Sequence, residues 1–165
     1  MMMLYHGSLS IVREPIVGLG RHLVDFGQGF YLTQIVEQAS AWAKTCALRS
    51  MHGQPVLSIY AFDDQAAKVE CGERYKIFTS YDAEWLEYVV DCRNGGNLQN
   101  GYDVIEGGVA NDNVIDTVEL YEKGYLTVEQ AIDTLAFKKV NHQLCLRSQD
   151  IVDHFLKFIR VEEVQ

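Results

Sequence analysis

The chain has 165 residues and a formal net charge of −9, with 48% hydrophobic and 22% charged residues. These values are typical of an ordinary globular protein and exclude a disordered chain. They also argue against sequence-independent binding of nucleic acid, which depends on Lys and Arg contacting phosphates, while a nucleic-acid substrate held briefly by a local basic patch stays open. We expect residues 1–165 to form one domain.

Neither a membrane span nor a metal site is expected. No apolar run approaches the roughly 20 residues that cross a bilayer, and the opening Met-Met-Met-Leu-Tyr-His lacks the basic region of a signal peptide. The sequence therefore predicts a cytoplasmic protein without a membrane partner. The cysteines are far apart, and the histidines lack metal-ligand spacing, so we expect reduced thiols and no metal. The cysteines are Cys46, Cys71, Cys92 and Cys145.

The first half of the chain alternates apolar runs with turn-forming residues. A buried strand is expected over residues 2–7, a long loop over 8–28, a strand over 30–33, a helix over about 34–51 and a strand over 55–62. Thr33 is the expected cap of that helix. A loop as long as 8–28 within one domain is usually functional.

The second half contains more helix. We expect a strand within 66–78, a helix over 82–93, a strand over 102–107, helices over about 112–123 and 127–138, a strand over 141–147, and a helix from Ser148 to about 159. Thr127 is the expected cap of the second of the paired helices. Strands and helices interleave without regular βαβ spacing, which favours an α+β fold.

Two short motifs carry the functional prediction. The first is Tyr5-His6-Gly7-Ser8, and the second runs from Phe26 through Gly27-Gln28-Gly29-Phe30-Tyr31 to Thr33. Trp42 follows Tyr31 by eleven residues. Together they resemble the NAD-binding core of the ADP-ribosyltransferase superfamily, in its His-Tyr-Glu branch of diphtheria toxin and the poly-ADP-ribose polymerases.

The resemblance to the polymerases is confined to these motifs. Nearly the whole chain also resembles an uncharacterised bacterial domain family assigned to the same fold. The resemblance implies an α+β domain in which a split pair of small antiparallel sheets surrounds an NAD cleft, with helices outside.

The chemistry of NAD cleavage explains why such residues are needed. Breaking the nicotinamide–ribose bond passes through an oxocarbenium-like state, as glycoside cleavage does. The protein must hold the leaving nicotinamide and orient the ribose for attack. Aromatic side chains hold the flat nicotinamide ring by stacking, and a glycine lets its carboxamide reach backbone N–H and C=O groups.

The resemblance assigns roles to individual residues. It implies that Gly7 supplies the backbone pair for the carboxamide and that Tyr31 and Trp42 form the two walls around nicotinamide. His6 would hydrogen-bond the adenosine ribose, and Ser8 completes the NAD-binding motif. Trp42 as an ordinary core residue of an amphipathic helix stays an open alternative.

The second motif also supplies a turn. Gly27 and Gly29 would permit a turn at the base of the site. In the polymerases a serine that holds the carboxamide stands three residues before the second aromatic wall. Here that position is Ala39, with Ser40 beside it, which puts this contact in doubt.

The third polar position of the family falls on Gln143. The polymerases have a glutamate there, which binds the ribose 2′-hydroxyl and assists transfer. Glutamine can hold the hydroxyl but cannot act as a general base. The resemblance therefore implies transfer of single ADP-ribose units, with His6, Tyr31 and Gln143 as the catalytic set and catalysis by positioning and electrostatics. A merely solvent-facing Gln143 is the alternative.

Further residues are candidates for lining the cleft. Arg21 and Arg13, in the long loop, suit the NAD pyrophosphate. The alternative is that both side chains are solvated and bind no ligand. Asp25 would orient the loop or a ribose hydroxyl. The pairs Tyr102-Asp103 and Asn111-Asp112 lie near glycines and could line the cleft, though turns also favour such residues.

The leading expectation is therefore a mono-ADP-ribosyltransferase that uses NAD as co-substrate, transfers ADP-ribose to a macromolecule and releases nicotinamide. The alternatives are a non-catalytic module that binds NAD or ADP-ribose and a partner-binding protein with a degenerate cleft. The acceptor class stays open among protein, nucleic acid and small molecule. Because bacterial transferases of this type are often toxins, a small neutralising partner protein is a further expectation.

Overall fold

The fold is α+β and contains two separate β-sheets, which confirms the predicted class. A computed structural model describes residues 1–50, 53–111, 114–138 and 140–164. Within these ranges, no helix combines the length and the apolar character needed to cross a bilayer. All four cysteines are free thiols, as expected.

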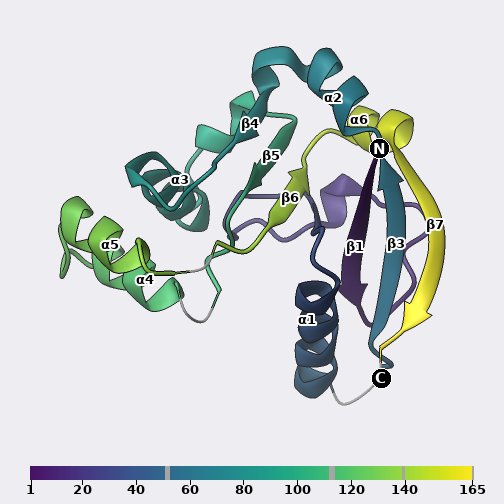
Figure 1. Ribbon diagram of the computed structural model, residues 1–165, viewed down its shortest axis with the longest axis horizontal. Helices are drawn as coiled ribbons and strands as arrows, with labels where there is room; N and C mark the ends of the chain where they lie inside the picture. The colour runs from purple at the N-terminus through teal and green to yellow at the C-terminus, as the bar shows by residue number, and fades with distance from the viewer. Residues whose placement is uncertain (51–52, 112–113, 139, 165) are drawn as a thin grey trace.

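The first sheet is antiparallel and has the strand order β1-β3-β7 (Figure 1). Its strands are β1 Met2–Ser8, β3 Val56–Phe62 and β7 Leu156–Glu163. Every residue of β3 is buried, because this apolar strand is paired on both edges. Helix α1, Val36–Arg49, packs against β1 and β3.

The second sheet has the order β2-β6-β5-β4. Its strands are β2 Phe30–Leu32, β6 Gln143–Leu146, β5 Val104–Gly107 and β4 Tyr75–Ile77. The expectation of purely antiparallel sheets is wrong here, because β4 pairs with β5 in parallel. Helix α3, Ala83–Arg93, lies in the connection between these strands, and a parallel pair requires such a long crossover.

The two sheets meet at one isolated bridge between Tyr5 and Thr33. The Tyr5 N–H donates to Thr33 O at 2.8 Å, and the Thr33 N–H donates to Tyr5 O at 3.0 Å. A shared hydrophobic cluster supports this junction, with Leu4 and Tyr60 of the first sheet packed with Leu144 of the second. Backbone pairing thus joins the two sheets at Tyr5 and Thr33, and apolar packing supports the junction.

The remaining helices lie beside the sheets and pack partly on one another (Figure 1). They are α2 Asp64–Cys71, α4 Ile115–Glu122, α5 Val128–Leu135 and α6 Gln149–Phe155. Short 3₁₀ turns lie at Val17–Leu19, Gly72–Arg74 and Leu98–Gly101. Helices α3, α4 and α5 pack together beside the second sheet, around a cluster centred on the fully buried Trp85 (Figure 1).

Most predicted elements are present, but the start of one helix differs. Helix α1 begins after Ile35, not directly after Thr33. The Thr33 backbone belongs to the bridge, and its hydroxyl accepts from the Ile35 N–H at 3.1 Å instead of capping the helix. Thr127 is confirmed as the cap of α5, with a reciprocal bond to Gln130. Residues 51–52 and 112–113, at the ends of two expected helices, lie outside the described residues.

Two segments have a different secondary structure from the expected one. Residues 64–71 are helical, with Asp63 accepting from the Ala66 N–H as its cap, so the strand expected within 66–78 is limited to β4. The helix expected to reach residue 159 ends at Phe155. From Leu156 the chain pairs with β3, and the Phe158 ring lies 5.8 Å from that of Tyr60. Tertiary pairing overrides local helix propensity here.

Gly7 is the tightest contact between β1 and α1. A Cβ atom at Gly7 would lie 2.0 Å from the carbonyl oxygen of Ala39. We predict that Gly7→Ala lowers the free energy of unfolding by about 1–3 kcal/mol, because strand and helix must separate. Urea denaturation measures the change. Gly18→Ala is the matched control, since its Cβ would meet nothing within 4 Å, and equal stability of the two variants would contradict the prediction.

Candidate functional site

His6 is fixed to the neighbouring sheet by its own ring. Its Nδ1 atom lies 2.8 Å from the carbonyl oxygen of Tyr31, and its ring centroid lies 4.5 Å from that of Phe30. Burial lowers the pKa of His6, while the bond to the Tyr31 backbone partly opposes that shift. A carbonyl only accepts, so we assign the proton of the neutral ring to Nδ1. Nε2 is then left as a hydrogen-bond acceptor.

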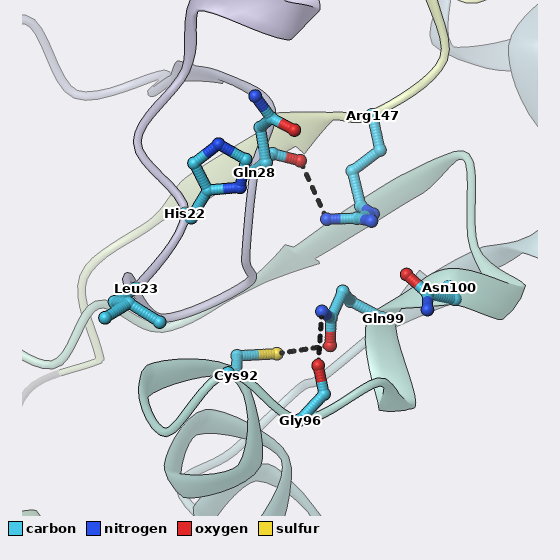
Figure 2. A pocket seen from close by; sticks show the side chains of 9 residues that line it. His22, Leu23, Gln28, Cys92, Gly96, Gln99, Asn100 and Arg147 are labelled. Atoms are coloured by element: carbon cyan, nitrogen blue, oxygen red, sulfur yellow. Dashed lines mark hydrogen bonds between the residues drawn. The ribbon is translucent and has the colours of Figure 1, made fainter.

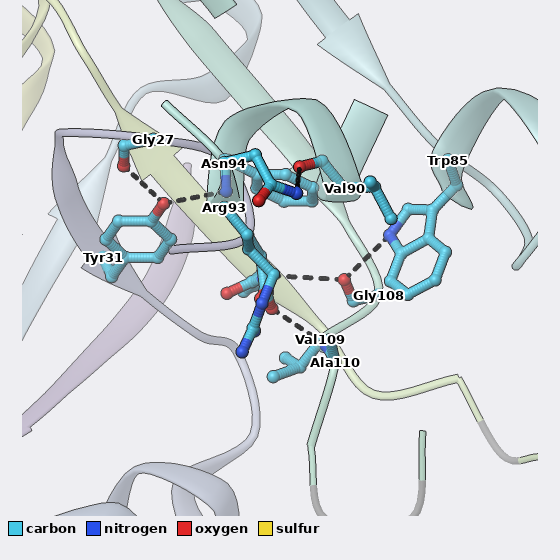
Figure 3. A network of polar contacts seen from close by, with 12 residues as sticks. Gly27, Tyr31, Trp85, Val90, Arg93, Asn94, Gly108, Val109 and Ala110 are labelled. Carbon is cyan, nitrogen blue, oxygen red and sulfur yellow. Dashed lines mark hydrogen bonds and ion pairs between the residues drawn. The ribbon is translucent and has the colours of Figure 1, made fainter. Parts of the chain in front are cut away.

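Tyr31 is locked to the glycine turn that precedes it (Figure 3). Its hydroxyl donates to Gly27 O at 2.6 Å and accepts from the Phe26 N–H at 3.0 Å. Burial raises the pKa of Tyr31 well above its ordinary value, so the phenol stays protonated and able to donate. Gly27 has φ +72°, a conformation that glycine adopts without strain.

Arg147 donates hydrogen bonds to the same turn, a role that was not predicted from the sequence. Its Nη1 atom donates to Phe26 O at 3.1 Å and to Gln28 O at 2.7 Å (Figure 2). Gly29 completes the close packing, because a Cβ there would lie 2.4 Å from the sulfur of Cys145. The sequence signal for this role is that Arg147 directly follows Leu146, the last residue of β6.

Asp25 is the centre of a buried polar network. Its Oδ1 accepts from Arg93 Nη1 at 2.8 Å, and its Oδ2 accepts from the Ala110 N–H at 2.9 Å and from Gln143 Nε2 at 3.1 Å. Gln143 Nε2 also donates to Gly108 O at 3.2 Å. Asp25 and Gln143 are each 7% exposed. The sequence predicts an orienting role for Asp25 but not its contact with Arg93.

Sheet register places Gln143 and Tyr31 on one face of the second sheet. Tyr31 pairs with Cys145 across β2 and β6, and Gln143 lies two residues before Cys145. Because strand side chains alternate between faces, all three point to the same side. The register thus places Tyr31 and Gln143 on one face, while His6 contacts the Tyr31 backbone and the Phe30 ring.

The opposite wall of the predicted site lies on α1. Ala39 is buried against β1. Because it is an alanine, the position where the polymerases have a serine carries no hydroxyl. Trp42 is 40% exposed and does not belong to the core. The guanidinium carbons of Arg21 and Arg49 lie 5.4 Å and 5.9 Å from the Trp42 ring centre, which is cation–π distance.

Two other candidates from the N-terminal segment have contacts of their own. The guanidinium of Arg13 lies 5.0 Å from the ring centre of Phe158 on β7, away from Trp42 and Arg21. The Ser8 hydroxyl donates to Ser10 O at 2.6 Å.

Of the residue pairs predicted to line the cleft, Tyr102 and Asp103 make contacts elsewhere. Tyr102 packs against the hydrophobic cluster around Trp85. Asp103 forms an ion pair with Arg74 at 2.6 Å. Asn111 is intermediate in exposure and follows Ala110 directly, and Asp112 lies outside the described residues.

Two cavities lie beside this constellation rather than in it. A cavity of about 180 Å³ lies against the glycine turn and is lined by residues that include Gln28, Gln99 and Arg147 (Figure 2). A second, of about 420 Å³, is lined by the segment 13–16 and by α6. Neither is lined by His6, Gly7 or Tyr31. The first is smaller than the ~300–1,000 Å³ typical of ligand pockets.

A second set of linked hydrogen bonds lies beside β6, the strand of Gln143. His142 Nδ1 accepts from the Gln34 N–H at 3.2 Å, so Nε2 carries the proton that faces Glu106 Oε1 at 3.1 Å. Glu106 also accepts from the Tyr75 hydroxyl at 3.1 Å. The bond from His142 lowers the pKa of Glu106, against the opposing effect of burial.

The Tyr31 hydroxyl is predicted to stabilise the fold. In Tyr31→Phe the Gly27 carbonyl and the Phe26 N–H both lose a partner, which costs about 1–3 kcal/mol of unfolding free energy. Urea denaturation measures the loss. Tyr125→Phe, at a position 74% exposed, is the control and should be near neutral. A Tyr31→Phe variant as stable as this control would show that the turn does not depend on the hydroxyl.

Glu106 is predicted to contribute to acid sensitivity. Its pKa is lower in the folded than in the unfolded state, so its stabilisation is complete above the ordinary carboxyl pKa of about 4.3 and is lost as the pH falls through the folded value. Glu106→Gln should make stability fall less steeply between about pH 5 and pH 3. Thermal melts over this range test the slope, and an unchanged slope would contradict the assignment.

Comparison with known proteins identifies a family but no activity. A family model described as a protein of unknown function, DUF3990, matches residues 2–158. No curated protein and no solved structure matches the chain. Because the family match spans nearly all of the sequence, the chain belongs to the DUF3990 family of proteins of unknown function.

Proposed function

We propose that this protein is a mono-ADP-ribosyltransferase of the His-Tyr-Glu type, which moves ADP-ribose from NAD to a macromolecular acceptor and releases nicotinamide. Two observations carry this proposal, namely the contact of His6 with the Tyr31 backbone and the position of Tyr31 and Gln143 on one face of the second sheet. These are the three positions to which the resemblance assigns catalytic roles, and they come from three different strands.

The backbone of Gly7 suits the nicotinamide carboxamide. The N–H and C=O groups of Tyr5 face Thr33, away from β3. Backbone direction repeats every second residue in an antiparallel strand, so the same groups of Gly7 face that edge too. Within the described strands, β1 pairs along this edge only at Tyr5. One donor and one acceptor are thus available side by side, as a carboxamide requires.

Hydrogen-bond acceptors suit the ribose hydroxyls. His6 Nε2 is an acceptor, because Nδ1 carries the proton that faces Tyr31 O. In the described part of the chain, Gln143 Oε1 makes no hydrogen bond, since both contacts of this amide involve Nε2. Hydroxyl groups donate to such acceptors, so the NAD ribose is the part of the ligand that these two residues would orient.

Arg21 occupies the position on the Trp42 ring that nicotinamide would take. In the ligand-free protein the guanidinium of Arg21 lies over the Trp42 ring. We propose that nicotinamide takes this stacking position opposite Tyr31 and that the displaced Arg21 pairs with the pyrophosphate. A guanidinium forms strong paired hydrogen bonds to phosphate oxygens, so the same loop would close over the bound NAD.

The reaction needs positioning more than proton abstraction. The bond between ribose C1′ and the nicotinamide nitrogen breaks, and its electron pair leaves with nicotinamide. An acceptor nucleophile bonds to C1′ and releases its proton to water. Since Gln143 cannot take that proton, the contribution of His6, Tyr31 and Gln143 would be to orient NAD and to stabilise the cationic ribose.

His6→Ala and Trp42→Ala are each expected to reduce nicotinamide release from NAD at least about tenfold, because each loses a contact that orients the ligand. Release is measured by chromatography, with folding checked by circular dichroism. His154→Ala, on the exposed side of α6, is the matched control and should keep full activity. Folded variants at both sites with full release would mean that NAD is not cleaved here.

A non-catalytic NAD-binding module is the second candidate, and the engaged amide of Gln143 favours it. Calorimetry separates the two, because a binder gives heat with NAD but releases no nicotinamide. A partner-binding protein with a degenerate site gives no heat. The acceptor is proposed only as a macromolecule, and a neutralising partner would be sought by co-purification from the native host.

A further inference from the structure

The side-chain amide of Gln143 can adopt only one orientation. Its Nε2 atom faces Asp25 Oδ2 and Gly108 O, and both of these oxygens can only accept. The Gly108 carbonyl also accepts from Trp85 Nε1 at 3.1 Å (Figure 3). A flipped amide would place Oε1 against two oxygens in a buried site, where unpaired polar groups are costly. Oε1 is therefore the end of the amide left for a ligand.

Asp25 is held rigidly enough to impose this orientation. It accepts hydrogen bonds from Arg93 on α3 and from the Ala110 N–H after β5, in addition to the bond from Gln143. The carboxylate is buried and comes from the long loop between β1 and β2. Two partners other than Gln143 therefore hold the carboxylate that orients the amide.

We propose that Asp25 is a positioning residue for Gln143 and that glutamine is the residue this site requires. The inference rests on the proposed function. Asp25 directs the acceptor oxygen of Gln143 to the 2′-hydroxyl of the nicotinamide ribose. It also places a negative charge one amide away from the ribose that becomes cationic, although Arg93 offsets part of it. Gln143 and Asp25 together do what a single glutamate does in related transferases.

A glutamate at position 143 would not fit this arrangement. In Gln143→Glu a carboxylate oxygen replaces Nε2 beside Asp25 Oδ2 and Gly108 O, at separations near 3.1 Å and 3.2 Å. Two carboxylates at this distance repel strongly in a buried site. The substitution that restores the residue of the polymerases should therefore impair this protein.

Three variants test the inference by nicotinamide release and thermal unfolding. Gln143→Glu should release nicotinamide at least about tenfold more slowly than the unmodified protein and melt at a lower temperature. The double variant Asp25→Asn/Gln143→Glu, which removes the repulsion, should recover at least about threefold over Gln143→Glu. Gln65→Glu adds the same charge on exposed α2 and should change neither property. Release by Gln143→Glu at or above the unmodified rate would overturn the inference.

Asp25→Asn alone distinguishes positioning from a structural role. The asparagine amide cannot accept from Arg93, Ala110 and Gln143 at once, so the orientation of Gln143 is no longer fixed. We expect kcat for NAD to fall about tenfold while KM changes less than about threefold in the folded variant. Equal changes in kcat and KM, or none in either, would contradict a positioning role.

A spectroscopic measurement on the ligand-free protein makes the orientation testable without turnover. The two ¹⁵N-bound side-chain protons of Gln143 should exchange slowly with solvent, and their resonances should shift in Asp25→Asn but not in Gln65→Glu. Resonances that do not respond to Asp25→Asn would overturn the inference. If they respond but the unmodified protein releases no nicotinamide, the orientation stands and the proposed transferase function fails.

Discussion

The pairing between Tyr5 and Thr33 determines how the two sheets lie relative to each other. Backbone hydrogen bonds join the sheets at this single bridge, and the apolar cluster around Leu4 and Tyr60 holds them there. Beyond the bridge, β1 continues past His6 and Gly7 without a strand partner on this edge within the described residues. Among the described strands, the backbone N–H and C=O of the buried Gly7 thus lack a partner on this edge, next to His6.

Much of the fold followed from local patterns. The apolar run of β3, the acidic start of α3 and the Thr127 cap each reflect physics within a few residues. The errors occur where distant partners decide. Leu156–Glu163 is a strand because β3 offers an edge to pair with, and Thr33 does not cap α1 because its backbone joins the two sheets. The parallel pairing of β4 with β5 likewise depends on a crossover that local pattern does not specify.

The candidate site was predictable to the extent that it depends on motifs. Resemblance suggested His6, Tyr31 and Gln143, and sheet register places the last two on one face. The groups that orient them could not be derived in the same way. Arg147 and Arg93 act through contacts with loop atoms more than 60 positions away in sequence, and a single arginine has no pattern that predicts such a contact. Arg13, suggested by its charge alone, lies against Phe158 instead.

Gly7 offers the most direct test of the account. The central claim is that nicotinamide binds to the unpaired backbone of Gly7, between Tyr31 and the α1 wall. The ¹⁵N–¹H resonance of the Gly7 amide, followed while NAD is titrated into the protein, reports on this contact. The account predicts a saturable downfield shift of this resonance, reproduced by nicotinamide alone. Saturable binding of NAD with an unmoved Gly7 resonance, or no binding at all, would contradict it.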